Sequence, residues 1–269
     1  MKTALTIAGS DSGGGAGIQA DIKAMSALGV FGMSVITAVT AQNTREVRSV
    51  QNIDLEIIRD QIEAVFDDIQ VDAVKIGMLA NAETVNVVAQ SLKKYKPNYV
   101  VVDPVMISKG GHYLLQESAV KALVNELLPL ATLITPNIPE TEVLVGNPVQ
   151  TEDEMYKACI QLKEMGPDAV LIKGGHLAGD SNDLYYDGVN FHWLKSKRIE
   201  TKNTHGTGCT LSSAIAANLA KGATMLEAVT SAKVYITTAI THSLEIGTGH
   251  GPTHHFHDLY ELAKGEKSK

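Results

Sequence analysis

The chain has 269 residues, of which 44% are hydrophobic and 20% charged, a composition typical of a protein with a large buried core. The formal net charge is -7 and lysine and arginine do not cluster, so we expect no nucleic-acid partner. Since we find neither a signal-peptide pattern nor an apolar run of transmembrane length, we expect a cytoplasmic protein without membrane contact.

Short β-branched runs alternate with longer amphipathic stretches along the chain. The predicted strands cover residues 4–8, 35–39, 73–76, 99–102, 132–135 and 169–172. The predicted helices cover residues 17–28, 55–66, 82–94, 118–127, 151–165, 210–220 and 226–243. This alternation predicts an α/β fold in which helices cover both faces of a mainly parallel central sheet.

Residues 182–194 depart from the alternation. There the turn-forming pair Asp187 and Gly188 separates two short apolar runs, a pattern typical of a β-hairpin. We therefore expect a small hairpin at the edge of the sheet. No linker rich in proline, serine or charge divides the sequence, so we expect a single domain over residues 1–269.

Polar or glycine-rich groups follow six of the predicted strands. In open parallel sheets, ligands bind beyond the carboxyl ends of the strands. We therefore expect the six groups to line one edge of the sheet and to converge on one cleft. They begin at Gly9, Ala41, Gly77, Asp103, Pro136 and Lys173.

The first glycine cluster, residues 9–17, follows a strand and opens a helix, as a dinucleotide-binding turn would. The next strand, however, runs into residues 40–43, which offer no carboxylate to bind a ribose. Ile18 and Gln19 stand where a P-loop would carry its lysine and hydroxyl. A nicotinamide site and a P-loop are therefore disfavoured, and the glycines are better suited to close approach by a small ligand.

The second cluster, residues 203–210, precedes another predicted helix. Backbone N–H groups of Gly206, Thr207 and Gly208, together with the positive end of the helix dipole, are suited to a phosphoryl group in transfer. A thiol in this position should have a lowered pKa, so we predict that Cys209 is a reactive thiolate or a proton acceptor. Cysteine-hydrolase chemistry with His205 as the base is an alternative, although no third, orienting group is evident.

Taken together, these motifs resemble those of the hydroxymethylpyrimidine (phosphate) kinases, and they occur in the order of that family over nearly the whole chain. The resemblance implies a ribokinase-like fold and two successive phosphoryl transfers from ATP. Hydroxymethylpyrimidine would become its monophosphate and then the diphosphate used in thiamin biosynthesis. The motifs are residues 9–17 with Asp21, 41–44, 75–78, 103–106, 135–137 with Glu140, 173–176 and 204–210.

The resemblance also implies which residues contact the pyrimidine. Gln42 would hydrogen-bond its amino edge, Gly9 and Asp21 would lie at the substrate, and Met78 and Val105 would enclose the ring. Apolar walls with a few polar anchors are what a small aromatic ligand requires. The co-substrate would be ATP, the cofactor Mg²⁺, and we expect a homo-oligomer, a dimer.

The same resemblance assigns Asp103, Asn137 and Glu140 to the phosphates and Mg²⁺, with Asp103 and Glu140 holding the metal directly or through water. Carboxylate and water oxygens are the ligands that Mg²⁺ prefers. Lys173 and Lys233 would lie near the phosphates as point charges. For Lys233 the alternative is a surface lysine whose stem covers a neighbouring apolar stripe.

In related sugar kinases, an aspartate that acts as base follows the last glycine of the anion loop, where this chain has Cys209. The resemblance places Cys209 at the hydroxymethyl group, either as general base or as a positioning contact. Pyridoxal or pyridoxine kinase activity of the same superfamily is the alternative function. Because the predicted lid, residues 105–112, lacks the second cysteine that aids pyridoxal phosphorylation, we expect pyridoxal to be a poor substrate.

Two further alternatives come from other classes of protein. Four histidines near the carboxyl end have spacings compatible with a transition metal, but no cysteine or acidic pattern completes a compact site. The resemblance implies a structural loop there. A pyrimidine-binding protein without catalysis is the other alternative, and hydroxymethylpyrimidine-dependent ADP release would exclude it. The four histidines are His250, His254, His255 and His257.

Overall fold

A single nine-stranded sheet organises the part of the chain that this computed structural model describes, residues 1–106, 117–177 and 179–266. Its strand order is β3-β2-β1-β4-β5-β6-β7-β8-β9. The six central strands, β2, β1, β4, β5, β6 and β7, run parallel to one another. At one edge β3 pairs antiparallel with β2, and at the other β8 pairs antiparallel with β7 and β9 with β8. The strands are β1 (Thr3–Asp11), β2 (Phe31–Gln42), β3 (Val47–Asn52), β4 (Ala73–Ile76), β5 (Val100–Val102), β6 (Leu133–Ile134), β7 (Ala169–Ile172), β8 (Asp183–Tyr186) and β9 (Phe191–Leu194).

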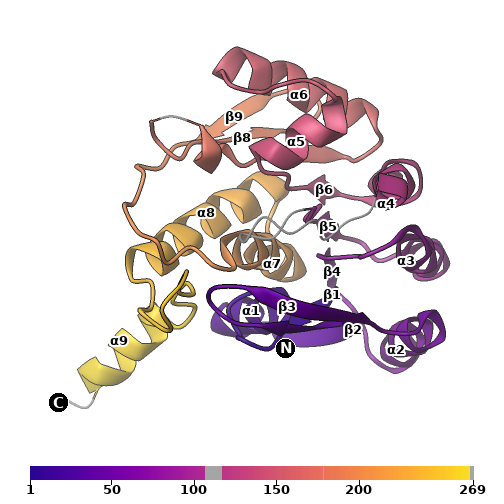
Figure 1. The fold of residues 1–269 in the computed structure, drawn as a ribbon, viewed down its shortest axis with the longest axis horizontal. Coiled ribbons are helices and arrows are strands. Elements are labelled where there is room, and N and C mark those ends of the chain that lie inside the picture. The colour runs from indigo at the N-terminus through magenta and orange to yellow at the C-terminus, as the bar shows by residue number, and fades with distance from the viewer. Residues whose placement is uncertain (107–116, 178, 267–269) are drawn as a thin grey trace.

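Helices cover both faces of this sheet, as Figure 1 shows. One face carries α1, α7 and α8, and the opposite face carries α2, α3 and α4. Near the carboxyl end of the chain, α9 extends away from the body of the molecule. The helices are α1 (Gly17–Ala27), α2 (Leu55–Asp68), α3 (Ala82–Tyr95), α4 (Glu117–Ala122), α5 (Ile138–Val145), α6 (Glu152–Glu164), α7 (Thr207–Ala220), α8 (Met225–Thr241) and α9 (His257–Glu266).

Alternation along the central strands gives the protein two hydrophobic cores, one on each face of the sheet. Leu5 and Ile7 of β1 point into the core beneath α2 and α3, while Ala4 points into the core beneath α1, α7 and α8. Successive strand side chains face opposite sides, so a strand covered on both faces has no polar side. This explains why β4, β5 and β7 are almost wholly apolar.

The predicted α/β fold with its mainly parallel sheet and edge hairpin is confirmed. The hairpin is β8 and β9, which pair antiparallel. Sequence reasoning missed β3, α5 and α9, and β2 is longer than predicted. Most of β3 is exposed, so it has no alternating apolar face, and α5 is a helix of only 8 residues with a capping box between Asn137 and Glu140.

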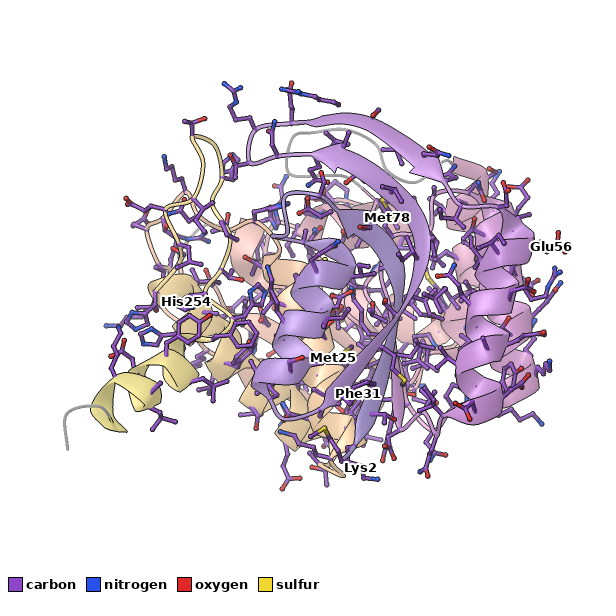
Figure 2. All side chains as sticks on the ribbon, turned by 90° about the horizontal axis from the view of Figure 1, so that it is seen from below. Lys2, Met25, Phe31, Glu56, Met78 and His254 are labelled. Atoms are coloured by element: carbon purple, nitrogen blue, oxygen red, sulfur yellow. The ribbon has the colours of Figure 1, made fainter. Side chains whose placement is uncertain are left out.

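The carboxyl ends of the parallel strands meet at one edge of the sheet. Figure 2 shows Met78, which follows β4, toward one end of the sheet, with Lys2 and Phe31 at the opposite end, where β1 and β2 begin. The strand-end groups are therefore positioned to form one site, as predicted. Within the described ranges, no helix has the length and apolar character needed to cross a membrane.

Two neighbouring isoleucines of α2 test the contribution of the core beneath that helix. Ile58 is fully buried, whereas Ile57 is 49% exposed. We expect Ile58→Ala to lower the free energy of unfolding by about 2–5 kcal/mol, because it leaves a cavity in the core. The control Ile57→Ala should change it by less than about 0.5 kcal/mol. Urea denaturation followed by circular dichroism measures both, and equal losses would contradict this assignment of the core.

Candidate active site

Two neighbouring cavities open at the carboxyl edge of the sheet. They share four lining residues, Asn137, Lys173, Thr207 and Gly208. The first cavity is otherwise lined mainly by the first glycine loop and the ends of β2, β4 and β5, and it includes Gly9, Gln42, Lys75, Met78, Asp103, Val105, Glu140 and Cys209. The second has apolar and basic walls that include Arg198, Leu211, Lys233, Ile236 and Ile240.

The second glycine loop forms the wall between the cavities. Gly206 is the N-cap of α7 and has a φ of 76°, a left-handed conformation that favours glycine. A Cβ on this residue would lie 1.7 Å from the carbonyl oxygen of Gly15, so no other residue fits. The first turn of α7, whose N–H groups have no acceptor within the helix, therefore lies between the cavities, where these groups can bind an anion. Thr207 N–H also has a long contact of 3.4 Å to the carbonyl oxygen of Thr204.

A lysine and two carboxylates face this loop. Lys173 Nζ donates to Asp103 Oδ1 at 2.7 Å and lies 4.0 Å from Glu140 Oε2. A Cβ on Gly208 would lie 3.2 Å from both Asp103 Oδ2 and Lys173 Nζ, so the loop approaches this group closely because residue 208 is glycine. The anion loop and the side chains of Asp103 and Lys173 thus lie against each other at the same part of the site.

The side chains around Lys173 differ in how the site shifts their pKa values. Burial raises the pKa of Glu140 to about 7, with Lys173 acting against this shift and Asp103 adding to it. Burial opposes the charge on Lys173, but the two carboxylates outweigh it and keep the pKa of Lys173 above its usual value. Glu140 is therefore poised to ionise when further positive charge enters the site.

A fully buried ion pair extends from the floor of the first cavity into the protein. Lys75 Nζ is 2.9 Å from both carboxylate oxygens of Asp21, which also accept hydrogen bonds from Thr6 and Ser213. All four side chains are 0% exposed. Burial opposes the charge of Lys75, but Asp21 outweighs this effect and keeps its pKa above the usual value.

This pair changes the interpretation of Asp21. We expected Asp21 at the substrate, but the structure places it under the cavity, with its oxygens occupied and without a place in the cavity lining. Lys75, to which sequence reasoning gave no role, does line the cavity. The available signal was a lysine inside the apolar strand β4, because an unpaired charge is too costly to bury there.

Cys209 lines the first cavity, but its thiol does not have the lowered pKa that its place at a helix N-terminus predicted. Burial raises the pKa of Cys209 to about 11, with Lys75 acting against this shift and Asp21 and Asp103 adding to it. Desolvation and two nearby carboxylates thus outweigh the lowering effects of Lys75 and of a backbone hydrogen bond from Gly17. At neutral pH the side chain is a neutral thiol. Cys159, by contrast, is buried in the core as predicted.

The other residues assigned to the pyrimidine lie together in the first cavity. Gly9, Gln42, Met78 and Val105 all line it. Because Gly9 has no Cβ, the methyl group of Met78 packs against its backbone, where a Cβ would lie only 2.6 Å away. Of the predicted lid, residues 105–112, the structure describes only Val105 and Met106. The prediction that a cysteine is missing from the lid therefore rests mainly on positions outside the described ranges.

Lys233 lines only the second cavity. Its Nζ donates to Asp183 Oδ2 and to the carbonyl oxygen of Ser181, each at 2.7 Å. Asp183 also accepts from the backbone of Gly174, so Lys233 holds the loop after β7 in place. Lys233 is therefore a structured, partly buried residue and not a surface lysine.

The histidine-rich carboxyl segment packs against the anion-loop helix. His255 Nε2 lies 2.9 Å from Thr210 Oγ1, and burial lowers its pKa to about 4. His242 and His257 stack with ring centroids 3.6 Å apart. The described residues contain no group of three histidine, cysteine or acidic side chains that could hold a metal ion. These contacts tie the segment to α7 and α8.

The anion loop between two cavities, at the carboxyl edge of a parallel sheet covered on both faces, defines a ribokinase-like small-molecule kinase. The family model described as phosphomethylpyrimidine kinase matches residues 11–254. The chain belongs to this family.

Individual relatives agree with that assignment. A hydroxymethylpyrimidine/phosphomethylpyrimidine kinase of Rhizobium meliloti is 53% identical over 94% of this chain and 97% of its own length. The crystal structure of a phosphomethylpyrimidine kinase from Clostridium difficile has a TM-score of 0.81 and 50% identity, over 89% of this chain and all of its own. A Bacillus subtilis pyridoxal kinase, solved as an ADP complex, has a TM-score of 0.89 and 42% identity, over 95% and 97%.

Lys75→Met tests whether the buried pair supports the site. The change leaves Asp21 buried without its cation, so we expect the free energy of unfolding to fall by about 3–5 kcal/mol. Lys93→Met is the matched control, because Lys93 pairs with Glu126 on the surface, where both side chains are about half exposed. Such pairs contribute at most about 1 kcal/mol. Urea denaturation measures the free energy of unfolding of both variants. Equal losses in this free energy would contradict the prediction.

Proposed function

We propose that the protein transfers the γ-phosphoryl group of ATP to the hydroxymethyl group of 4-amino-5-hydroxymethyl-2-methylpyrimidine, and then phosphorylates the monophosphate to the diphosphate for thiamin biosynthesis. The observation that carries this proposal is the glycine loop shared by two cavities. One cavity suits a small aromatic acceptor and the other a nucleotide. The family membership and the names of the relatives supply the identity of the acceptor.

The pyrimidine occupies the first cavity in this proposal. Met78 and Val105 form apolar walls, Gln42 provides an amide for the polar edge of the ring, and Gly9 allows close approach. Small-molecule sites combine such walls with a few polar groups that set orientation. Asp21 contributes indirectly, because it fixes the position of Lys75 in the cavity floor.

ATP occupies the second cavity. The apolar side chains of Leu211, Ile236 and Ile240 suit an adenine ring, while Lys173 and Lys233 place positive charge near the phosphates. The hydroxymethyl oxygen attacks the γ-phosphorus in the shared passage, and the bond from that phosphorus to the ADP oxygen breaks. Backbone N–H groups from Gly206 to Gly208 bind the equatorial oxygens during transfer.

Asp103 and Glu140 fit a Mg²⁺ ion that enters with ATP. Two carboxylates with water and substrate phosphates are a sufficient ligand set, because Mg²⁺ in kinases seldom needs an all-protein cage. Glu140, whose pKa burial raises to about 7, would be held ionised by the added cation. Bound Mg²⁺ would neutralise charge on the phosphate oxygens, and Asn137 caps the helix that carries Glu140.

Cys209 contacts the hydroxymethyl oxygen as a neutral thiol and positions it for attack. A thiol with a pKa of about 11 is almost entirely protonated at pH 7.5, which makes a ground-state thiolate base unfavourable. Phosphoryl transfer has a loose transition state and requires little help from a base. The hydroxyl proton therefore leaves late in the reaction, when the attacking oxygen has become acidic, and passes to a non-bridging oxygen of the transferred phosphoryl group, from which it is lost to solvent.

Pyridoxal phosphorylation is the second candidate activity. The observation in its favour is the 42% identity and close structural similarity to the Bacillus subtilis pyridoxal kinase. Against it stands the sequence of the predicted lid, in which residues 105–112 contain no cysteine. We propose that pyridoxal is at most a side substrate. The single domain, the homodimer and the cytoplasmic location stay predictions.

A coupled assay of ADP release tests the proposed function directly. We expect Mg²⁺-dependent release with hydroxymethylpyrimidine and with its monophosphate, and a kcat/KM for pyridoxal lower by about tenfold or more. Gln42→Leu should reduce kcat/KM for the pyrimidine by about tenfold or more while the KM for ATP stays within about twofold. Absence of ADP release with either pyrimidine would refute the proposal, and comparable kcat/KM values for pyridoxal would refute its selectivity.

Cys209→Ala distinguishes positioning from base catalysis. A positioning contact predicts a fall in kcat below about tenfold and a wild-type kcat that is flat between pH 7 and 9. A thiolate base with a pKa near 11 would instead make kcat rise about tenfold per pH unit, since the ionised fraction grows by that factor below the pKa. A loss of about a hundredfold in the alanine variant, with recovery in Cys209→Asp, would assign the base role to Cys209.

A further inference from the structure

Asp11 and His205 connect the two glycine loops. Asp11 is the last residue of β1 and pairs with Thr40 of β2, so its backbone belongs to the sheet. His205 immediately precedes Gly206, the N-cap of α7. The two side chains meet in the first cavity, where His205 Nε2 lies 2.8 Å from Asp11 Oδ2. A side chain that is fixed on the sheet thus binds the residue next to the start of the anion-loop helix.

The Asp11 carboxylate is held in place by the first glycine loop. It is 3% exposed, and its Oδ1 accepts the backbone N–H of Gly13 at 2.8 Å. Its Oδ2 accepts the backbone N–H groups of Gly15 and Ala16 at 3.1 and 2.9 Å. Burial opposes the charge, but His205 and the backbone donors outweigh burial and hold the pKa of Asp11 below its usual value. An ionised carboxylate has no hydrogen to donate, so the hydrogen between the two side chains is carried by His205 Nε2.

The two loops also pack against each other around this pair. A Cβ on Gly15 would collide with His205 Cδ2, so the imidazole ring lies directly on the first loop. A Cβ on Gly206 would collide with the carbonyl oxygen of Gly15. The backbone N–H of Gly17 donates to the thiol of Cys209. The bond between carboxylate and imidazole therefore acts where the two loops are in contact.

In the proposed reaction each loop serves one of the two reacting groups. The first loop lines the acceptor cavity with residues that include Ser10, Ala16 and Gly17. The second loop supplies the backbone N–H groups for the phosphoryl group in transfer. The distance from the attacking oxygen to the γ-phosphorus therefore depends on how the loops are held together. Reacting atoms must approach to about 3–3.5 Å, and a misplacement of about 1 Å can reduce the rate about a hundredfold.

We propose that His205 is a positioning residue for phosphoryl transfer, because its bond to Asp11 holds the anion loop where the bound hydroxymethyl group can attack. His205 takes part in no proton transfer and acts through the loop. This inference rests on the proposed function, which places the acceptor and the phosphoryl group on the two sides of the contact. A role in acceptor binding is the competing explanation, since Gln42 Nε2 lies 3.3 Å from His205 Nε2.

His205→Leu separates these two explanations. The change removes the N–H donor, while Asp11 keeps its three backbone donors, so we expect the variant to fold, as circular dichroism would verify. We expect kcat for ADP release with the aminopyrimidine to fall by about tenfold to a hundredfold. The KM values for ATP and for the pyrimidine should stay within about threefold, because the loop position matters for the transition state and not for either ground-state complex.

Other histidine substitutions serve as controls. His205→Gln supplies an N–H donor of similar reach and should keep kcat within about threefold of the wild type. His205→Asn has a shorter amide that ends before Asp11 and should lose kcat as the leucine variant does, so it replaces that variant if leucine prevents folding. His250→Leu is the matched control, because His250 is exposed and its Nδ1 contacts the carbonyl oxygen of Lys202. Its kcat should stay within about twofold.

A double-mutant cycle tests whether His205 acts through Asp11. Asp11→Asn keeps the size of the side chain and removes its charge. If the two residues act as a pair, the loss of kcat in the double variant with His205→Leu should be smaller than the product of the two single losses, by about threefold or more. Independent residues would give the full product, and the cycle cancels any effect of Asp11→Asn on the first loop alone.

The outcomes separate this inference from the function on which it rests. If the wild-type protein releases no ADP with either pyrimidine, the proposed function is wrong and this inference falls with it. If the wild-type protein is active and His205→Leu keeps its kcat, the positioning role is wrong while the function stands. A raised KM for the pyrimidine at unchanged kcat would also overturn it, in favour of acceptor binding through Gln42. So would a glutamine variant as impaired as the leucine variant, or losses that multiply in the cycle.

Discussion

The arrangement of the site depends on one buried ion pair. Asp21 of α1 binds Lys75 of β4, and the same carboxylate accepts hydrogen bonds from Thr6 of β1 and Ser213 of α7. Four elements that are distant in sequence thus meet at one carboxylate, in a region without exposure to solvent. A buried charge is tolerated only when it is paired and hydrogen-bonded, so the pair fixes the register of these elements.

The position of α7, which this ion pair helps to fix, determines how the rest of the site is arranged. Because α7 is held against β1 and β4, its N-terminal loop meets the first glycine loop, with Gly206 packed on Gly15. The same placement brings Gly208 to the Asp103 and Lys173 side chains. Partly buried near two carboxylates, the Cys209 thiol has a raised pKa, and for this reason the proposed mechanism relies on electrostatic stabilisation and positioning.

Sequence reasoning predicted the layers of the fold well because apolar periodicity reports burial on one or both faces. It missed β3, whose side chains are largely exposed and carry no periodic signal. For the site, strand-end groups indicated Gln42 and Asp103, since the topology of a parallel sheet brings strand ends together, and a glycine cluster before a predicted helix indicated the anion loop. It could not show that Asp21 lies below the cavity or that desolvation dominates at Cys209, because both depend on tertiary contacts.

The wall that separates the two cavities also separates two sets of lining residues. Gln42, Met78 and Val105, which we assign to the acceptor, line the first cavity and not the second. Substitutions at these positions can therefore alter acceptor selectivity and leave the ATP-binding residues in place. A fold divided in this way can retain one phosphate donor while its acceptor chamber diversifies. The close structural similarity between this chain and a kinase named for pyridoxal is what such a division would produce.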